Sequence, residues 1–380
     1  MNDDFKRKLE LYDKDEMTSE EKKEFEKEMD AREEQWMKSG LDKTKQRKIL
    51  RASKWKARIG TALSALAFLF LILIIASFVT NFYYYGISDT ENRAQKLSNI
   101  IQYGTLITDP YGVGRANNQE VGTFFTMNVT KDLKKIVGKE ELTVGEMKVN
   151  FFFSKMGFPE IRKFKEVKDN EYQLKFNHPD SNYEYAVHTI QEWNRLEMLP
   201  EGTVATAFIS FDKIVPTQEV FERFENRDLD ILWFPVDVYS KEGLEADVFS
   251  LEGPIGFPNN PILHPDDWTL ESRTEERSFF GSQVSETHSA IPYEEGDVEI
   301  LHNQFMKTLR FLEHHESEFD KLRPYSPMKL NEKVKFLESN GINHYGVVIT
   351  GPSKEILALK DEEWVESLHI DEVALWNWNN

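Results

Sequence analysis

The chain has 380 residues and a formal net charge of −19, and it contains no cysteine. The absence of cysteine excludes structural disulfides and zinc sites that use cysteine ligands. The strongly acidic balance argues against nucleic acid as a partner, because a phosphate backbone binds basic surfaces.

Two short amphipathic helices are predicted near the N-terminus, one over residues 1–12 and one that ends at Ser39-Gly40. Thr18 and Glu21 form the capping-box pattern that opens the second helix. Most other positions in both helices are charged, so each helix has one narrow apolar stripe. The stripe residues are Phe5, Leu9, Tyr12, Phe25, Met29 and Trp36.

These two helices carry too few apolar residues to form a core of their own, and we expect the stripe to be exposed unless a partner covers it. Helices with large anchors at positions i and i+4 commonly bind in the groove of another protein. Residues 1–58 are therefore predicted to be a partner-binding segment. The alternative is a solvated segment whose basic end, before residue 59, touches anionic lipid.

A transmembrane helix is predicted over residues 59–82, because residues 59–79 carry no charged side chain. At about 1.5 Å per residue, this uncharged stretch is about 32 Å long and matches the hydrocarbon core of a bilayer. Asp42 is predicted to cap the helix that leads into the span, and basic residues crowd the segment from Lys43 to Arg58. Basic flanks stay in the cytoplasm, so the N-terminus is expected inside and the chain after residue 82 outside. An aromatic belt at residues 82–85 is expected at the outer interface.

The charge distribution agrees with this division of the chain. Residues 1–58 hold 17 basic and 15 acidic side chains, a net charge of +2, and the rest of the chain holds 30 basic and 51 acidic side chains, a net charge of −21. The outer part is predicted to be an α+β region with mixed sheets and packed helices. Its expected parts are a tether over residues 83–122, an α+β unit over residues 123–202 and a C-terminal α+β domain over residues 203–380.

Strands and helices are predicted in the outer part from alternation, helical spacing and capping residues. The predicted strands lie at residues 123–130, 144–153, 171–176, 203–211, 230–239, 345–350 and 372–378. The predicted helices begin after Asn182, at Pro216-Thr217, at Val298, at Asn331 and at Ser353. Residues 240–296 are rich in proline and acidic residues and are expected to form a long loop region.

The outer part shows no motif for catalysis, for a cofactor or for a metal. His314 and His315 are adjacent, so they point about 100° apart on a helix and make a poor pair of metal ligands. The turn from Thr350 to Ser353 joins a strand to a helix but lacks the lysine and the further glycines of a phosphate-binding loop, so helix capping is the preferred interpretation. We therefore expect no enzyme activity, no cofactor and no metal.

Several strings in the chain carry a resemblance to a known family. They are LELYDKDEMTSEEKKEFEKEM before the span, and LPEGTVATAFISFDKIVPTQEVFERF, NGINHYGVVITGPSKEI and EVALWNW after it. With the single span, they make the chain resemble the sigma factor regulator family, the membrane-bound anti-sigma factors of Gram-positive bacteria. The similarity is greatest to the branch that regulates the extracytoplasmic-function sigma factor sigma-M.

This resemblance implies that residues 1–58 hold an extracytoplasmic-function sigma factor at the cell membrane, away from RNA polymerase, until an envelope signal is sensed outside. The protein would bind no DNA directly, and a second membrane protein is left open as a further partner. The zinc module of many other anti-sigma factors is excluded, because the chain has no cysteine. The contact residues are our own inference from the stripe: Phe5, Leu9, Tyr12, Phe25, Met29 and Trp36.

Two other classes of function are kept as alternatives. The outer part could be an enzyme or a binding protein that acts on a cell-wall component, with residues 1–58 as an inert anchor, or the chain could be a structural subunit of an envelope complex. An enzyme should show a pocket with converging acid and base groups. A structural subunit should bind no sigma factor.

Overall fold

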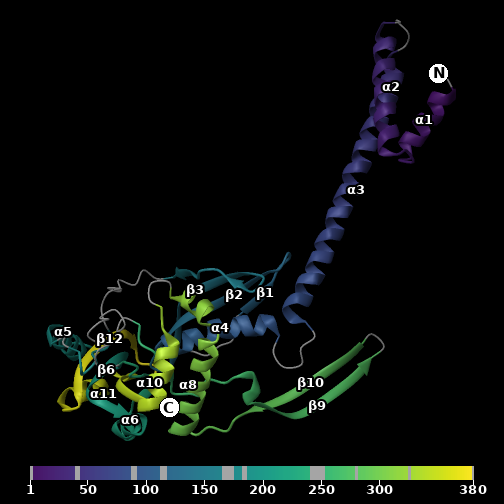
Figure 1. Ribbon diagram of the computed structural model, residues 1–380. Coiled ribbons are helices and arrows are strands. Elements are labelled where there is room, and N and C mark those ends of the chain that lie inside the picture. The colour runs from purple at the N-terminus through teal and green to yellow at the C-terminus, as the bar shows by residue number, and fades with distance from the viewer. Residues whose placement is uncertain are drawn as a thin grey trace. The chain divides into compact units, whose positions relative to one another are not determined.

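The computed structural model describes residues 3–38, 43–86, 92–111, 118–164, 175–181, 186–239, 253–278, 281–323 and 327–378. Contacts divide the chain into two compact units, Met1–Val79 and Thr80–Asn380, whose elements Figure 1 traces. The predicted fold class is confirmed: short helices and one long apolar helix precede a region in which antiparallel sheets and helices pack together.

The first unit contains helices α1 (Asp3–Asp13), α2 (Ser19–Lys38) and most of α3 (Lys43–Tyr85). The predicted capping box is present, because the Thr18 N–H donates to the Glu21 carboxylate at 2.8 Å and the Glu21 N–H donates to Thr18 Oγ1 at 3.4 Å. The predicted boundary residues Ser39, Gly40 and Asp42 lie outside the described side chains. Within α3, Arg51–Tyr85 is long and apolar enough to cross a membrane, as the sequence predicts.

The second unit begins with an antiparallel sheet in the order β1-β2-β3-β4, in which β5 also pairs with β3. Buried and less buried side chains alternate along much of β2, as expected for a strand with one face on a core. Strand β2 starts later than the strand predicted at 123–130 and extends further, and β3 starts earlier than the strand predicted at 144–153. The strands are β1 (Asn118–Val121), β2 (Thr126–Val137), β3 (Glu140–Phe152), β4 (Lys155–Met156) and β5 (Glu160–Lys163).

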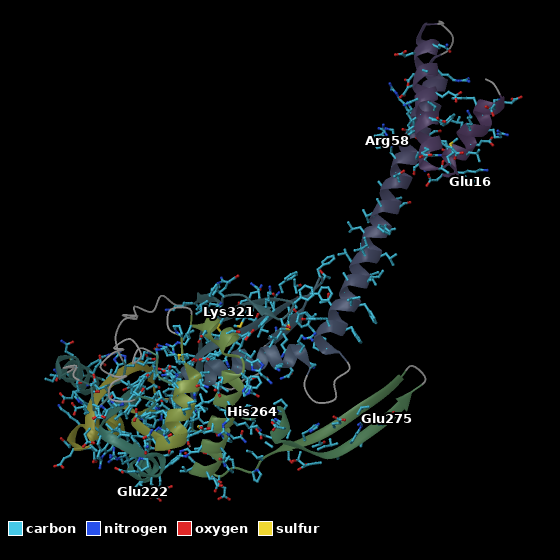
Figure 2. All side chains as sticks on the ribbon, viewed as in Figure 1. Glu16, Arg58, Glu222, His264, Glu275 and Lys321 are labelled. Atoms are coloured by element: carbon cyan, nitrogen blue, oxygen red, sulfur yellow. The ribbon has the colours of Figure 1, made fainter. Side chains whose placement is uncertain are left out.

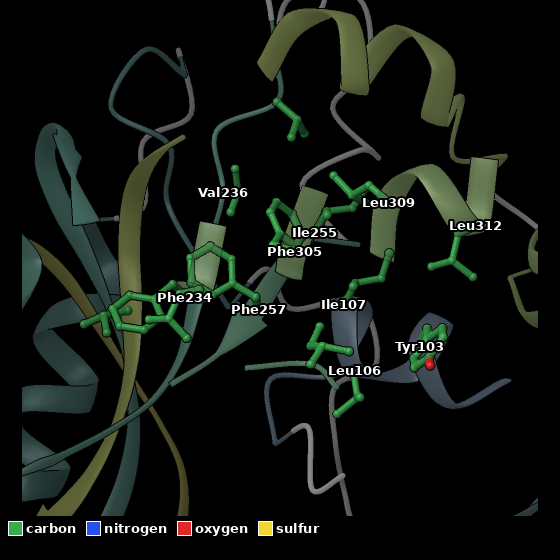
Figure 3. Close-up of a cluster of buried hydrophobic side chains, with 14 of the residues drawn as sticks. Tyr103, Leu106, Ile107, Phe234, Val236, Ile255, Phe257, Phe305, Leu309 and Leu312 are labelled. Carbon is green, nitrogen blue, oxygen red and sulfur yellow. The ribbon is translucent and has the colours of Figure 1, made fainter. Parts of the chain in front are cut away.

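Helix α4 (Arg93–Thr108) lies inside the stretch that the sequence predicts to be a tether. Its buried face includes Leu97, Ile100 and Ile107, and Figure 3 shows Ile107 and its neighbours beside residues of α8 and β8. The prediction of a tether is therefore wrong for α4 and β1. The start of this stretch is moderately helical in sequence, but its many polar residues favour a tether, although the apolar residues alone form a buried stripe.

A second antiparallel sheet, in the order β12-β6-β11-β7-β8, forms the C-terminal half. The predicted strands at 203–211 and 345–350 are central strands of this sheet, and residues 203–211 are buried along their whole length. Continuous apolar runs are expected where both faces of a strand are covered. The strands are β6 (Thr203–Pro216), β7 (Asp230–Pro235), β8 (Gly256–Pro258), β11 (Asn343–Pro352) and β12 (Val365–Leu375).

Helices pack against this sheet and against α4. In α8, the apolar residues Leu301, Phe305, Leu309 and Leu312 are buried, as their helical spacing predicts. The helices are α5 (Ala186–Glu197), α6 (Thr217–Phe224), α8 (Val298–Glu313), α9 (Glu316–Phe319), α10 (Leu330–Asn340) and α11 (Ser353–Leu357), with 3-10 turns η2 (Pro265–Asp267), η3 (Asp320–Leu322) and η4 (Ala358–Asp361).

The two sheets meet at the turn between β2 and β3. The Gly138 N–H donates to Thr350 Oγ1 at 2.7 Å, and the Thr206 hydroxyl donates to the Ile136 carbonyl. Gly138 has φ +62, and a Cβ there would lie 1.9 Å from an atom of Asn377, so both the backbone conformation and the space favour glycine. The boundary predicted between residues 202 and 203 therefore does not correspond to a gap in the packing of this unit.

Residues 240–296, predicted to be a long loop region, contain a regular ribbon. Strands β9 (Trp268–Ser278) and β10 (Gly281–Ala290) pair along their length and project from the rest of the unit (Figure 1). The loop prediction is wrong here because most side chains of the ribbon are polar and exposed, so no hydrophobic alternation marks it. Residues 240–252 of the same stretch lie outside the described residues.

Three smaller predictions are also corrected. Helix α10 begins after Lys329 rather than with Asn331 as its cap, and Pro352, not Ser353, precedes α11. The Ser353 hydroxyl instead lies 2.7 Å from the Thr203 hydroxyl, which joins two neighbouring elements of the core. Of the strand predicted at 171–176, residues 171–174 lie outside the described part, and residues 175–176 are not in a strand.

Candidate functional site

The apolar stripe of the first two helices is buried inside the first unit, which corrects the expectation of an exposed stripe. Phe5, Tyr12, Phe25 and Met29 are at most 2% exposed and form a small core with Ala57 of α3. The ring centroids of Phe5 and Phe25 lie 5.2 Å apart, and those of Tyr12 and Phe25 lie 5.5 Å apart. Such distances are typical of packed aromatic pairs.

The other two stripe residues differ from these four. Leu9 is partly buried and packs against the same core. Trp36 lies within α2, but its side chain is outside the described part of the structure. The structure therefore brings five of the six predicted contact residues together, in contact with one another.

The third helix supplies what the sequence prediction left out. Ser53 and Ala57 of α3 are small and buried, and they lie one helical turn apart on the same face. Small side chains let a neighbouring helix approach closely, so large residues from α1 and α2 can cover this face. The three helices together therefore enclose a small apolar core that α1 and α2 alone do not have.

Ion pairs and a hydrogen bond surround this core. The Tyr12 hydroxyl donates to Glu26 at 2.6 Å, and burial together with this bond raises the pKa of Tyr12 well above its usual value. Lys8 of α1 lies 3.3 Å from Glu28 of α2, and Lys54 of α3 pairs with Asp30 of α2. The basic segment before the span is therefore partly neutralised by acidic side chains of the same unit.

The outward surface of α1, α2 and the turn between them is predominantly acidic. Exposed basic residues are fewer: Lys6, Arg7, Lys14, Lys23 and Lys27. The exposed acidic residues are Asp3, Asp4, Glu10, Asp13, Asp15, Glu16, Glu20, Glu21, Glu24, Asp30 and Glu34. A surface of this kind attracts a basic partner and increases the rate of association with it.

The last residues of α3 form another site that sequence reasoning missed. It lies in the second unit, Thr80–Asn380, which is called the outer unit below after the location that the sequence predicts for it. The Tyr84 hydroxyl lies 2.6 Å from the Phe153 carbonyl and 2.9 Å from the Phe125 carbonyl, and Thr80 Oγ1 accepts from the Phe125 N–H at 2.9 Å. Tyr84 is fully buried, although the sequence predicts it in an interfacial aromatic belt. The phenylalanine rings of residues 125 and 153 are stacked at 4.3 Å, and the Tyr83 ring meets both edge-on.

The backbone at this junction is unusual. Phe124, Phe125 and Phe153 have φ values of 53, 59 and 54°, in the left-handed region that bulky residues rarely adopt. Each such residue costs of order 1 kcal/mol and persists only where surrounding contacts hold it. The contacts with Thr80, Tyr83 and Tyr84 hold Phe125 and Phe153 in this way, so the junction fastens this end of α3 to the β2–β3 sheet.

Two clusters of ionisable groups lie in the core of the outer unit. Asp371 pairs with Lys135 at 2.9 Å and with Lys175 at 3.2 Å, and it accepts from the Tyr111 hydroxyl. Burial alone would raise the pKa of Asp371, but the two ammonium groups hold that pKa at about 2. The partners compensate one another's charges, so this cluster fits a structural network.

The other cluster is a chain of uncharged hydrogen bonds. Thr217 Oγ1 lies 2.6 Å from His302 Nε2 and 2.7 Å from His344 Nε2, and His344 Nδ1 lies 2.9 Å from the Pro235 carbonyl. A carbonyl only accepts, so Nδ1 of His344 carries the proton and Nε2 accepts from Thr217. Burial lowers the pKa of His344 to about 3 and that of His302 to about 4, and both side chains are therefore neutral near pH 7.

The histidines singled out from the sequence lie at the end of α8. His314 Nδ1 lies 2.6 Å from the Arg310 carbonyl, and His315 Nδ1 lies 2.8 Å from the Phe311 carbonyl, so each side chain folds back onto its own helix. In the part of the chain that the structure describes, no group of three or more metal-ligating side chains is found.

Comparison with known proteins assigns the chain to a family. A family model described as "Sigma factor regulator N-terminal" matches residues 47–142, and one described as "Sigma factor regulator C-terminal" matches residues 196–372. The probable anti-sigma-M factor YhdL of Bacillus subtilis (strain 168) is 26% identical over 391 residues, which cover 100% of both chains. No solved structure shows a significant match.

The matched segments include Tyr84 and Phe125 of the junction, α4, the β2 strand and most of the C-terminal sheet, whereas α1 and α2 are matched only in the full-length alignment. The two models describe the two parts of one family and together cover more than half of this chain. The sequence resemblance is confirmed, and the protein belongs to the sigma factor regulator family.

Proposed function

We propose that this chain is a membrane-anchored anti-sigma factor, which sequesters an extracytoplasmic-function sigma factor through its N-terminal helices and responds to envelope signals through its outer unit. The observation that carries the proposal is the alignment over the whole chain with an anti-sigma factor, α1 and α2 included. The apolar length of α3 supports a single span, and the basic segment before it supports a cytoplasmic N-terminus and an outer C-terminal unit.

The role proposed for the protein is regulatory and not enzymatic. It binds the sigma factor, not DNA, because the exposed surface of α1 and α2 is acidic and repels a phosphate backbone. The same acidic surface is suited to the basic surfaces with which sigma factors contact DNA or polymerase. A second membrane protein is a further partner in this proposal, through the lipid-facing part of α3.

The stripe residues are proposed as the apolar part of the interface, although four of them are buried within the unit. The small core of Phe5, Tyr12, Phe25 and Met29 opens, and these side chains exchange contacts with one another for contacts with the sigma factor. Opening a core of this size costs little free energy, because the core buries few side chains and the ion pairs around it are at least partly exposed. The free and bound states then compete for one set of apolar groups.

A cross-link between α1 and α2 tests this exchange. Lys8→Cys with Glu28→Cys places two thiols where the side chains now meet, and the chain has no other cysteine. The cross-linked protein is expected to lose at least tenfold in affinity for the purified sigma factor, and reduction should restore binding. Asp4→Cys with Arg7→Cys, joined by the same reagent within α1, is the control and should bind normally. Full affinity of the α1–α2 cross-linked form would show that the buried stripe is not used.

Substitution of the stripe tests the wider proposal. Replacing Phe25, Met29 and Trp36 by alanine should release the sigma factor and raise transcription from its promoters, because large buried anchors carry most of the energy of such interfaces. Promoter activity and the amount of membrane-inserted protein are measured together. Unchanged promoter activity at a normal protein level would contradict the assignment of these residues.

A further inference from the structure

A cleft of about 750 Å³ opens in the outer unit along α4. The amide side chains of Asn92, the N-cap of α4, and of Gln95, Asn99 and Gln102 within α4 line it, and Asn260 lines it from the loop after β8. Their spacing of three, four and three residues places the four on one face of α4. The volume lies within the range of about 300–1,000 Å³ that is usual for ligand pockets.

The cleft carries almost no charge. Among the described residues that line it, Glu141 alone bears a full charge at neutral pH, and it is paired with Lys134 at 2.7 Å. His264 lines the cleft and is neutral, since burial and the nearby Lys307 lower its pKa to about 4. No lysine or arginine lines the cleft in the described part of the chain, so it is poorly suited to phosphate or carboxylate ligands.

Aromatic rings form another part of the wall. Trp268, at the start of β9, is 47% exposed and lines the cleft. Tyr103 is held in place by its ring contact with His264, with centroids 4.3 Å apart, and by its hydroxyl, which donates to the Leu263 carbonyl at 3.3 Å. Figure 2 labels His264 near the base of the β9–β10 ribbon. An exposed indole beside amides offers an apolar face next to paired donors and acceptors.

We propose that this cleft binds an uncharged oligosaccharide, the amides pairing with its hydroxyl or acetamido groups and Trp268 packing on the apolar face of a sugar ring. Side-chain amides donate and accept at once, as sugar hydroxyls do. An extended peptide would instead be expected to add to the strand edge at β8. The wall at that edge contains Pro258, Pro261 and Pro265, which have no N–H to donate.

The inference deepens the proposed function, because it names the chemistry of the envelope signal that the outer unit would sense. Helix α4 connects the cleft with the junction at the end of α3, because Arg93 at the start of α4 donates to the Tyr83 carbonyl at 2.8 Å. An oligosaccharide that contacts the amide face of α4 therefore acts on a helix that also touches the junction at the end of α3. Ligand binding and the state of the junction can be linked if the ligand prefers one arrangement of α4.

Binding is tested by calorimetry on the purified full-length chain in nanodiscs, with no sigma factor present. The probes are tetra-N-acetylchitotetraose, cellotetraose and an acetylated, amidated tetra-alanine peptide. Binding of either sugar supports the proposal, and the difference between them shows whether acetamido groups are recognised. Binding of the peptide with no binding of sugar would overturn it in favour of a peptide site, and no binding of any probe at millimolar concentration would also overturn it.

Variants locate the site. Gln102→Leu and Trp268→Ala should each weaken sugar binding at least tenfold while the thermal unfolding of the protein stays unchanged. Gln218→Leu, on the exposed face of α6, is the matched control and should bind as the parent does. Equal affinity in the parent, Gln102→Leu and Trp268→Ala would overturn the assignment of the cleft. None of these outcomes depends on the sigma factor. A failure of the sugar-binding proposal would therefore leave the proposal for sigma-factor binding by the N-terminal helices unaffected.

Discussion

Asp371 is the residue on which the charged network of the outer core depends. Its side chain is 3% exposed, and it neutralises Lys135 and Lys175 from two other segments of the chain. Removing one member of a buried pair is costly, because the remaining charge stays in a poorly solvated place. The network joins β12 to β2, so it also holds the two sheets of the outer unit together.

Asp371→Asn should therefore lower the free energy of unfolding of the outer unit by about 1–3 kcal/mol, a moderate loss because Lys135 keeps Glu372 as a partner and Lys175 is 37% exposed. Urea-induced unfolding followed by tryptophan fluorescence measures the change. The control is Glu197→Gln, which removes an exposed pair with Lys360 and should cost less than about 1 kcal/mol. Equal effects of the two substitutions would show that the network contributes nothing specific.

His344 makes stability depend on pH in a predictable direction. Its pKa is lowered to about 3 in the folded protein, whereas an unfolded histidine has a pKa of about 6.5. Between these values the unfolded chain binds a proton that the folded chain does not, so stability falls as pH falls below about 6.5. His302 and His264, each with a pKa lowered to about 4, act in the same direction.

His344→Gln should flatten this pH dependence. Unfolding is measured at several pH values between about 7 and 4, and the slope of the parent should exceed that of the variant by up to about 1.4 kcal/mol per pH unit. Gln218→Leu, at an exposed residue that does not titrate, is the control and should leave the slope unchanged. Parallel curves for the parent and His344→Gln would contradict the buried neutral state.

At the scale of elements, the junction between α3 and the β2–β3 sheet is the feature through which, under the proposed function, an outer signal would reach the predicted span. A single helix conveys a signal only through a change of association, orientation or integrity, and all three need a firm hold on its outer end. Tyr84 provides much of that hold, because the Phe153 carbonyl lies within 2.6 Å of its hydroxyl. The Phe125 carbonyl also accepts from the Phe153 N–H, so it keeps a partner if Tyr84 is changed.

Tyr84→Phe should lower the stability of the outer unit by about 0.5–1.5 kcal/mol, because the Phe153 carbonyl loses its donor in a partly buried place. It should also weaken the transcriptional response to envelope stress without weakening sigma-factor binding by the N-terminal helices. Thermal unfolding and reporter transcription measure the two effects. Tyr85→Phe, at a residue that is 40% exposed, is the matched control and should behave as the parent. A normal response in Tyr84→Phe despite lower stability would separate the junction from signalling.

At the scale of the whole molecule, the prediction concerns topology. Protease added to intact protoplasts should remove the region after residue 82 and leave a protected fragment of the first 80 or so residues, because the basic segment from Lys43 to Arg58 is expected to keep the N-terminus inside. Antibodies against each end identify the surviving fragment on gels. Protoplasts opened by detergent are the control and should lose both ends. Protection of the C-terminal end instead would reverse the topology.

The packing of the outer unit also decides where the chain can be truncated without exposing part of a core. Deletion of residues 203–380 would expose β2 and α4, whose side chains share a core with the C-terminal sheet. A loss of regulation in such a deletion would reflect unfolding as well as loss of the sensor. Ending the chain after Gly86, where α3 stops, leaves the N-terminal helices and the span without an exposed half-core.

The sequence by itself determined the long apolar helix, the capping box at Thr18, the central strands at 203–211 and 345–350, and the family. Each of these depends on a local pattern: an uncharged run, a pair of capping residues, a continuous apolar stretch, or strings shared with relatives. Local patterns survive in any tertiary context, so they can be read along one segment at a time. The function was inferred from the sequence strings that resemble the family, whereas the individual contact residues remain a prediction.

Only the tertiary structure decided that the stripe of α1 and α2 is buried, that α4 is a core helix and that residues 268–290 contain a ribbon. The physical reason is the same in all three cases, because each depends on a partner segment distant in sequence. Ala57 covers the stripe, α8 and β8 cover α4, and β9 and β10 satisfy each other's backbone groups without any apolar pattern. The cleft beside α4 follows from that placement, since amides from one helix become a site only when a second segment forms the opposite wall.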